Sequence, residues 1–428
     1  MVPKKKAPCG ASKEEIRCVC FVYGGGDPGV EESLEGMIRL GLKPGREASV
    51  ARRHPWLFSG ALASREGDGS DGHAEIVDSR GRALARGSYS PESQIVARLW
   101  TFDGRLADAS LFQERFRAAW RLRREVVAPV TTGFRAINSE GDLCPGVLID
   151  VYGEVAVLEL LTEGTEKWES DLADAARKVF SVPKIIVRRT GADRDAGSRP
   201  ESKIQNPKSK IEVVPFTENG LRFFADIPGG QKTGFFLDQR DNRIRLRSLA
   251  AGRTVLNLFS YTGAFSVAAL AGGAARAVDV DSSEAALDLS RQHRRANSFP
   301  AEDRDFVRAD VFEDLRRRVE AGETWGVVVC DPPAFARKRG DVPRAARGYK
   351  DINRLAMELV EPGGWLLTCS CSGQISSDLF QKIVFSASLD AGRSFSLTAR
   401  QGAGADHPVS LDCPEGEYLK GLWLSRQT

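Results

Sequence analysis

The segment TVLNLFSYTGAFSVAALAGGAARAVDVD, residues 254–281, decides the fold of this chain. Its order predicts a buried strand, a turn built on Gly263, a helix of small residues and a second strand that ends in Asp281. Apolar runs bounded by turn signals and followed by helical periodicity are typical of a parallel sheet core. Because strands and helices alternate from Thr254 to the end, we expect one doubly wound α/β domain there.

The strand ends predict where a ligand binds, because ligands of open α/β sheets lie beyond the carboxyl ends of the strands. Gly263 would let the first turn approach a ligand closely, and Asp281 could accept hydrogen bonds from a ribose. This segment has no GxGxxG motif, and GGQKTG at 229–234 lacks the spacing of a phosphate-binding loop. The pattern therefore favours a nucleoside ligand without a pyrophosphate, with S-adenosylmethionine as the leading candidate.

Two more acids follow later strands of the same array. FVRAD ends at Asp310, which could reach an adenine amino group or could cap the next helix, and both interpretations stay open. WGVVVCDPPAF places Asp331 after the next apolar run, where it would point into a reaction centre. Pro332 and Pro333 disfavour a helix directly after the strand, so we expect Asp331 on a stiff loop.

The segment GGWLLTCSCSG, residues 363–373, supplies the most reactive candidate. Cys371 lies at the carboxyl end of its predicted strand, at the edge where the ligand and Asp331 are expected. A thiolate there could add to an electrophilic carbon and later leave. Cys369 has the same side-chain direction two residues earlier, and we expect it to pack as a small buried hydrophobe.

A run of basic residues follows DPPAF directly. Next to a catalytic site such a loop suits a polyanionic substrate, although most charge runs are simply solvated. Phe335 could stack on a base or fill the core. The basic residues are Arg337, Lys338, Arg339, Arg344, Arg347 and Lys350, against the single acid Asp341.

Composition bounds the remaining possibilities. The chain has 428 residues, 42% of them hydrophobic, which suits two or three domains with cores of their own. No apolar run approaches the ~20 residues of a membrane span. The eight cysteines lack C-x-x-C pairs, so we expect no metal site and reduced thiols in a cytoplasmic protein. The net charge of +3 means that nucleic-acid contacts must come from local patches.

The pattern divides the chain into four regions. Residues 1–36 are predicted to be a disordered extension, 37–108 a β-rich module, and 109–227 a central α/β domain that contains a β-hairpin. Within the central domain, 190–210 holds almost no apolar residues and is predicted to be a flexible loop. The doubly wound domain is expected over 228–428.

Several motifs together resemble one known family, the bacterial large-subunit ribosomal RNA (cytosine-5)-methyltransferases with an N-terminal PUA domain. The resemblance runs in order from about residue 37 to the end, with only 1–36 and 190–210 outside it. The motifs that carry it are MIRLGLKPGREASVARRHPWLFSGAL, GVLIDVYG, KTGFFLDQRDNR, LNLFSYTGAFSVAAL, DPPAF, RGYKDINRLA, LLTCSCSG, SSDLFQKIV and EGEYLKG.

The resemblance implies a PUA domain at 37–108 and a class I methyltransferase domain with a seven-stranded, mostly parallel sheet. It implies S-adenosylmethionine as methyl donor and Cys371 as the nucleophile, and the strand pattern adds Asp331 as the second catalytic candidate. On the matching segments, the cofactor candidates are Asn257, Phe259, Tyr261, Gly263, Asp281, Asp310, Gln239 and Arg240. The substrate candidates are Pro333, Phe335, Arg337, Lys338, Arg339, Arg344, Arg347 and Lys350.

The resulting hypothesis is an RNA methyltransferase that forms 5-methylcytosine in large-subunit ribosomal RNA through a cysteine adduct. Two alternatives stay open: a methyltransferase acting on the exocyclic amine of guanine, and a non-catalytic RNA-binding factor of ribosome assembly. No membrane and no metal are expected as partners. The oligomeric state is left open, with a homodimer as one alternative.

Overall fold

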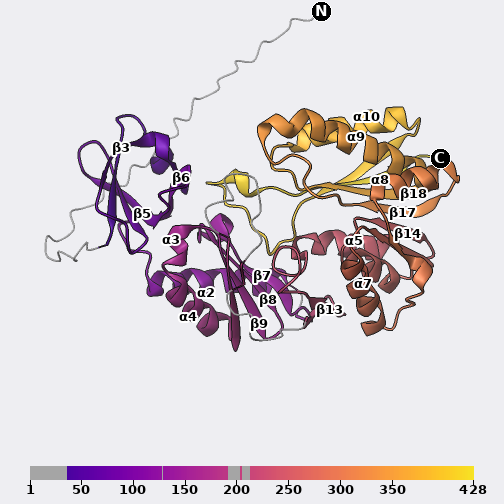
Figure 1. Ribbon diagram of the computed structural model, residues 1–428, viewed down its shortest axis with the longest axis horizontal. Coiled ribbons are helices and arrows are strands. Elements are labelled where there is room, and N and C mark those ends of the chain that lie inside the picture. The colour runs from indigo at the N-terminus through magenta and orange to yellow at the C-terminus, as the bar shows by residue number, and fades with distance from the viewer. Residues whose placement is uncertain (1–35, 128, 191–202, 205–212) are drawn as a thin grey trace, which may run out of the picture. The chain divides into compact units, whose positions relative to one another are not determined.

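The computed structural model describes residues 36–127, 129–190, 203–204 and 213–428. Figure 1 shows the helices and strands of the described residues in chain order, from indigo at the N-terminal end to yellow at the C-terminal end. The predicted disordered extension lies outside the described residues except for Gly36, and so does most of the predicted loop 190–210. Within that loop, two described residues form a short strand, β11 (Lys203–Ile204), which pairs with β10 (Lys184–Arg189).

The β-rich module is confirmed as a six-stranded sheet in the order β2-β6-β5-β4-β1-β3. One hairpin of this sheet turns at Asp78, whose Oδ1 accepts the backbone N–H groups of Arg80 and Arg82. The elements are β1 (Ile38–Leu42), α1 (Ala48–Ala51), β2 (Trp56–Phe58), β3 (Leu62–Glu66), β4 (His73–Val77), β5 (Ala83–Tyr89) and β6 (Ile95–Thr101).

The central region pairs its strands in the order β11-β10-β9-β8-β7, with α2 and α4 packed together. The β-hairpin predicted for this region is confirmed at 147–160, and two helices follow it. The hairpin β12–β13 forms a separate two-stranded sheet. The elements are α2 (Ala109–Val126), β7 (Gly133–Asn138), β8 (Val147–Tyr152), β9 (Val155–Leu160), α3 (Glu163–Glu166), α4 (Glu169–Phe180), β12 (Val214–Glu218) and β13 (Leu221–Ala225).

The doubly wound domain is confirmed as a seven-stranded sheet in the order β16-β15-β14-β17-β18-β20-β19. β20 is antiparallel to both of its neighbours, β18 and β19, and the other strand pairs of this sheet are parallel. The elements are η4 (Leu237–Gln239), α5 (Arg240–Leu249), β14 (Thr254–Leu258), α6 (Ala264–Ala271), β15 (Arg276–Asp281), α7 (Glu284–Ala296), β16 (Phe306–Arg308), α8 (Val311–Glu320), β17 (Trp325–Cys330), α9 (Val342–Leu359), β18 (Val360–Ser370), α10 (Ser377–Asp390), β19 (Phe395–Gln401) and β20 (Lys420–Arg426).

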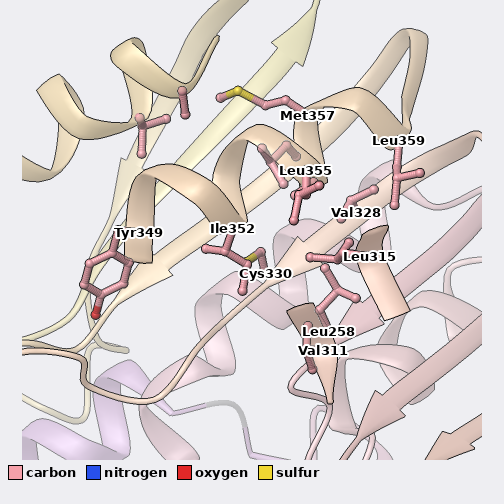
Figure 2. Close-up of a cluster of buried hydrophobic side chains, with 14 of the residues drawn as sticks. Leu258, Val311, Leu315, Val328, Cys330, Tyr349, Ile352, Leu355, Met357 and Leu359 are labelled. Atoms are coloured by element: carbon pink, nitrogen blue, oxygen red, sulfur yellow. The ribbon is translucent and has the colours of Figure 1, made fainter. Parts of the chain in front are cut away.

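The central strands are buried on both faces, as the near-continuous apolar runs predict. Val328 and Cys330 of β17 face the core formed with α8 and α9, where Ile352 and Leu355 lie against them (Figure 2). The alternate residues of β17 join the opposite core, built with α5 and α6. The strand order reverses between β14 and β17, so the loops after β14, β15, β17 and β18 meet at one edge of the sheet.

Among the described residues, no helix combines the length and the apolar character needed to cross a bilayer.

Candidate functional site

The loop after β14 has a backbone that few residue types can adopt. Gly263 has a φ of 71°, and a Cβ added there would lie 1.8 Å from Oγ of Ser290. Only glycine therefore fits at this turn. Phe259 and Tyr261 also have positive φ values, 54° and 48°, which non-glycine residues adopt rarely. Such backbone conformations gather at ligand sites, where the surrounding structure maintains them.

Asp281, at the end of β15, is bound to this loop. Its Oδ2 accepts the backbone N–H of Tyr261 at 2.8 Å, and its Oδ1 accepts that of Ser283 at 2.9 Å. Each carboxylate oxygen has a second lone pair, so the half-buried side chain can still accept a ribose hydroxyl. A carboxylate beside a glycine turn matches the acceptor that a nucleoside needs, so these residues fit S-adenosylmethionine.

Asp310 is the N-cap of α8, because its Oδ1 accepts the N–H of Glu313 at 3.1 Å. The helix-cap interpretation of this residue is confirmed. The side chain is exposed, and its use as an adenine contact remains a prediction.

Asn257 and Asp279 form a buried polar wall behind the loop. The Asn257 side chain donates to Oδ1 of Asp279 at 2.8 Å. Asp279 also accepts hydrogen bonds from Ser266, Ser290 and Arg294, at 2.5 to 2.8 Å. Asn257 is 1% exposed, so it supports the loop from within. The sequence interpretation missed Asp279, although an acid inside an apolar strand is a signal for such a network.

Asp331 follows β17, as predicted. Its Oδ2 accepts a hydrogen bond from Nε2 of Gln239 at 2.9 Å. Burial, followed by the neighbouring Asp238 carboxylate, raises the pKa of Asp331 to about 6. Lys232 acts in the opposite direction on this pKa. A carboxyl group with such a pKa can both accept and release a proton near neutral pH.

Cys371 follows the last residue of β18, and its Sγ lies 4.0 Å from the carbonyl oxygen of Pro332. The structure therefore brings Cys371 next to the DPP loop. Burial, followed by the charge of Asp331, raises the pKa of the Cys371 thiol to about 11. Cys369 is fully buried, in agreement with its predicted packing role.

A buried hydroxyl cluster fixes this juxtaposition. The Tyr349 hydroxyl lies 2.9 Å from Oγ of Ser372 and accepts a hydrogen bond from Ser370 at 3.0 Å. The backbone N–H of Ala336 donates to Ser372 as well. The loop after β17 and the end of β18 are thereby held together through α9.

Two cofactor candidates have other contacts in the structure. Gln239 is 2% exposed and holds Asp331. Arg240 is 4% exposed, and its guanidinium lies 2.8 Å from Asp406, 3.4 Å from Glu218 and 2.7 Å from the Gly133 carbonyl. These buried contacts hold the Arg240 guanidinium within the protein, which corrects its predicted role in cofactor binding.

The sequence interpretation missed a charged pair beside Asp331. Lys232 forms an ion pair with Asp238, and the Tyr418 hydroxyl donates to the same carboxylate at 2.7 Å. Lys232 has a positive φ of 51°, and its ammonium lies 4.4 Å from the ring centre of Phe236. Both charges come from QKTGFFLDQR, from which the sequence analysis had selected only Gln239 and Arg240 as candidates.

The basic residues after DPPAF do not form one loop. Arg337, Lys338 and Arg339 are exposed and precede α9, whereas Arg344 and Arg347 are exposed on α9 itself. This corrects the loop prediction, because Pro343 at the start of α9 favours helix there.

Three other substrate candidates also have defined positions. Lys350, also on α9, forms an ion pair with Asp390 at 2.7 Å, so its charge is not free for a substrate. Phe335 packs on Tyr349, with ring centres 4.6 Å apart, which favours the core interpretation over base stacking. Pro333 is exposed.

One other cluster has metal-ligand side chains. His54, Cys413 and Glu415 place ligand atoms within 4.8 Å of one another. Nδ1 of His54 accepts the backbone N–H of Trp56 at 3.1 Å, so the neutral ring carries its proton on Nε2, which faces Glu415 at 3.5 Å. The cluster is therefore explained by hydrogen bonding.

Comparisons with known proteins agree with this architecture. The family described as S-adenosylmethionine-dependent methyltransferase matches residues 195–391, and a PUA-like domain matches 40–102. A Klebsiella pneumoniae protein named ribosomal RNA large subunit methyltransferase I is 43% identical over 397 residues, which are 90% of this chain and 97% of that protein. A Yersinia pseudotuberculosis protein of the same name is 43% identical over 393 residues, covering 90% and 98%.

A solved structure shares the fold. The crystal structure of SMU.776 complexed with SAH has a TM-score of 0.77 at 24% identity and covers 91% of this chain and 100% of that chain.

Proposed function

The chain belongs to the family of ribosomal RNA large subunit methyltransferase I proteins, and from this membership we propose that it methylates C5 of a cytosine in large-subunit ribosomal RNA. It is an S-adenosylmethionine-dependent methyltransferase with an N-terminal PUA-like domain. The observation that carries the carbon chemistry is the position of Cys371 beside the Asp331–Pro332 loop. A nitrogen methyltransferase needs no thiol there.

A thiol is needed for methylation at C5 because C5 of cytosine is a weak nucleophile and must first be activated. Addition of the Cys371 sulfur to C6 gives C5 the character of an enamine carbon, which can attack an electrophile. When bound, S-adenosylmethionine supplies an electrophilic methyl group. A base then removes the C5 proton, the C6–S bond breaks, and the departing sulfur regains a proton from N3 through Asp331. A target inside paired RNA must first be flipped out, at a cost of roughly a few kcal/mol.

Asp331 provides the proton balance of the addition. At neutral pH the raised pKa of Cys371 keeps the thiol protonated, while Asp331, with a pKa of about 6, is mostly ionised. Asp331 takes up the proton that leaves the thiol and gives it to N3 of the cytosine. The negative charge of the attacking sulfur therefore never accumulates on the base.

The donor is expected to lie against Gly263 and Asp281, with its ribose on the Asp281 carboxylate. Replacing Asp281 by alanine should weaken S-adenosylmethionine binding about 10-fold or more, because hydrogen bonds to charged groups contribute about 1.5–3 kcal/mol. Isothermal titration calorimetry measures this affinity. Asp303→Ala, which removes a fully exposed acid near β16, is the matched control and should bind normally. Equal affinities of both variants would contradict the assignment.

The pH dependence follows from the two raised pKa values. Below the Asp331 pKa of about 6, both Asp331 and Cys371 are protonated, and the pair carries one proton too many for the addition. We expect kcat/KM to rise about tenfold per pH unit up to this pKa and then to level off, because the thiol pKa of about 11 lies far above it. Initial rates on a ribosomal RNA fragment measure the profile. An acid limb that remains in Asp331→Asn would contradict the assignment.

The exposed basic residues Arg337, Lys338 and Arg339 are proposed to contact RNA phosphates. Their backbone geometry is independent of the side chains, since the N–H groups of Arg337 and Lys338 bond to Asp341. Replacing all three by glutamine should weaken RNA binding and lower the salt slope by up to about one per lost phosphate contact. Filter binding over a range of salt concentrations measures both quantities.

The matched control removes three basic residues that carboxylates already neutralise, Arg304, Arg316 and Arg317. This control should leave the salt slope near its wild-type value. Identical slopes for the two triple variants would make the segment before α9 an ordinary solvated surface.

The proposed function as a whole is tested in cells. Mass mapping of ribosomal RNA nucleosides, with and without the gene, should show the loss of one 5-methylcytosine from the large subunit. Loss of a methylated guanine instead would favour exocyclic-amine chemistry, and no loss would favour a non-catalytic assembly factor. The oligomeric state remains a prediction.

A further inference from the structure

A directed chain of hydrogen bonds leads to Asp331. It begins at Trp423 of β20, whose indole N–H donates to Oδ1 of Asn242 at 2.8 Å. An indole can only donate, so this bond fixes which end of the Asn242 amide faces the ring. The amide nitrogen of Asn242 must then face the other way, where it donates to Oε1 of Gln239 at 2.7 Å.

The orientation passes on through Gln239. Because Oε1 is occupied, Nε2 of Gln239 is the end that faces the site, where it donates to Oδ2 of Asp331 at 2.9 Å. Nε2 also lies 3.6 Å from Sγ of Cys369, which accepts its second hydrogen. Trp423 and Asn242 are 0% exposed and Gln239 is 2% exposed, so water does not compete for these groups. The side-chain amides of Asn242 and Gln239 therefore each accept a hydrogen bond on the Trp423 side and donate one on the Asp331 side.

We propose that Trp423, Asn242 and Gln239 are positioning residues, which keep Oδ2 of Asp331 occupied by a donor and leave Oδ1 to exchange a proton with the target base. This proposal rests on the proposed function, in which Asp331 meets the base. Among the described residues, Oδ1 has no hydrogen-bond partner, in contrast to both oxygens of Asp281 and Asp279. A carboxyl group of Asp331 that is already held in the reactive orientation loses less conformational entropy when the target base binds.

The variant Asn242→Asp reverses the chain. The new carboxylate can accept from the indole but offers no donor to Gln239, so the Gln239 amide rotates and turns its oxygen toward Asp331. A carbonyl oxygen at hydrogen-bond distance favours the protonated form of Asp331. We expect the titration midpoint of Asp331 to rise by about one pH unit or more.

The readout does not depend on activity. Carbon-13 NMR of aspartate carboxyl groups in the full-length, RNA-free protein follows the midpoint, with Asp331→Asn identifying the signal. Asn242→Asp adds one carboxylate, whose negative charge also favours the protonated form of Asp331, so the uncharged variant Gln239→Met shows the effect of the hydrogen bond alone. The other charged or ionisable groups that act on Asp331, or that Asp331 acts on, are unchanged in both variants: Asp238 of η4, Lys232, Arg243 of α5, Cys330 of β17, Cys369 of β18 and Cys371.

A second variant keeps the test decisive if Asn242→Asp does not fold. Gln239→Met has a similar length and removes the donor outright, so the midpoint should rise here too. Cys369→Ala is the matched control, because it removes the other acceptor of Gln239 and should leave the midpoint unchanged.

The acid limb of kcat/KM should move with the midpoint, which a purely structural role would not cause. An Asp331 midpoint that stays at its wild-type value in the folded variants would overturn the proposal. Failure of the wild-type enzyme to methylate cytosine would instead overturn the proposed function, and the NMR result would stand by itself.

Discussion

Replacing Cys371 by alanine is expected to abolish methyl transfer while S-adenosylmethionine binding persists. If sulfur must add to C6, no second described thiol near Asp331 can replace Cys371, because Cys369 is fully buried. Removal of a covalent nucleophile costs on the order of 10⁴-fold or more in kcat. Transfer of a labelled methyl group to large-subunit ribosomal RNA measures the loss, and calorimetry with S-adenosylmethionine measures retained binding.

Cys369→Ala is the natural control, two residues away on the same strand. It should lower the melting temperature, because it leaves a small cavity in a packed core, but it should keep most of the activity. The opposite ranking of the two cysteine variants would contradict the assignment of the nucleophile.

Asp331→Asn is the second large effect that we expect. The amide keeps the shape of the side chain, but it cannot move a proton from the thiol to N3 of the base. Positioned proton transfer typically contributes about 10²–10⁴-fold, so kcat should fall by that order. Single-turnover methylation measures the step without product release.

The pattern of losses distinguishes this role from a loss of folding. Asp331→Asn should keep the melting temperature close to that of the wild type, because the new amide can turn its oxygen toward Nε2 of Gln239 and accept the same hydrogen bond. A variant that loses S-adenosylmethionine binding in parallel with activity would indicate that Asp331 belongs to the donor site instead.

Much of the fold could be predicted from the sequence because its signals are local. A glycine after one buried strand and acids after the next strands mark the edge of a parallel sheet, wherever the helices lie. The sequence therefore predicted the sheet edge at which Gly263, Asp281 and Asp331 lie in the structure. The same reasoning predicted the position of Cys371, because the end of its strand can be recognised in the sequence.

The contacts around Asp331 could not be predicted in the same way. Gln239 reaches Asp331 across 92 positions, and Tyr418 reaches Asp238 across 180. Such pairs depend on how β20 and η4 pack, which no local pattern encodes. Arg240 and Lys350 pair with carboxylates of the protein, although the sequence predicted cofactor and substrate contacts for them. An arginine or lysine looks the same in the sequence whether it faces solvent or a carboxylate.

The measurement that tests the central claim most directly is covalent trapping by RNA that contains 5-fluorocytosine. After methyl transfer, C5 carries fluorine in place of the proton that must leave, so the C6–S bond cannot break. Wild-type enzyme, incubated with S-adenosylmethionine and a substituted large-subunit ribosomal RNA transcript, should form a complex that survives denaturation and maps to Cys371. The absence of a complex, or an equal yield from Cys371→Ala, would contradict the cysteine-adduct mechanism.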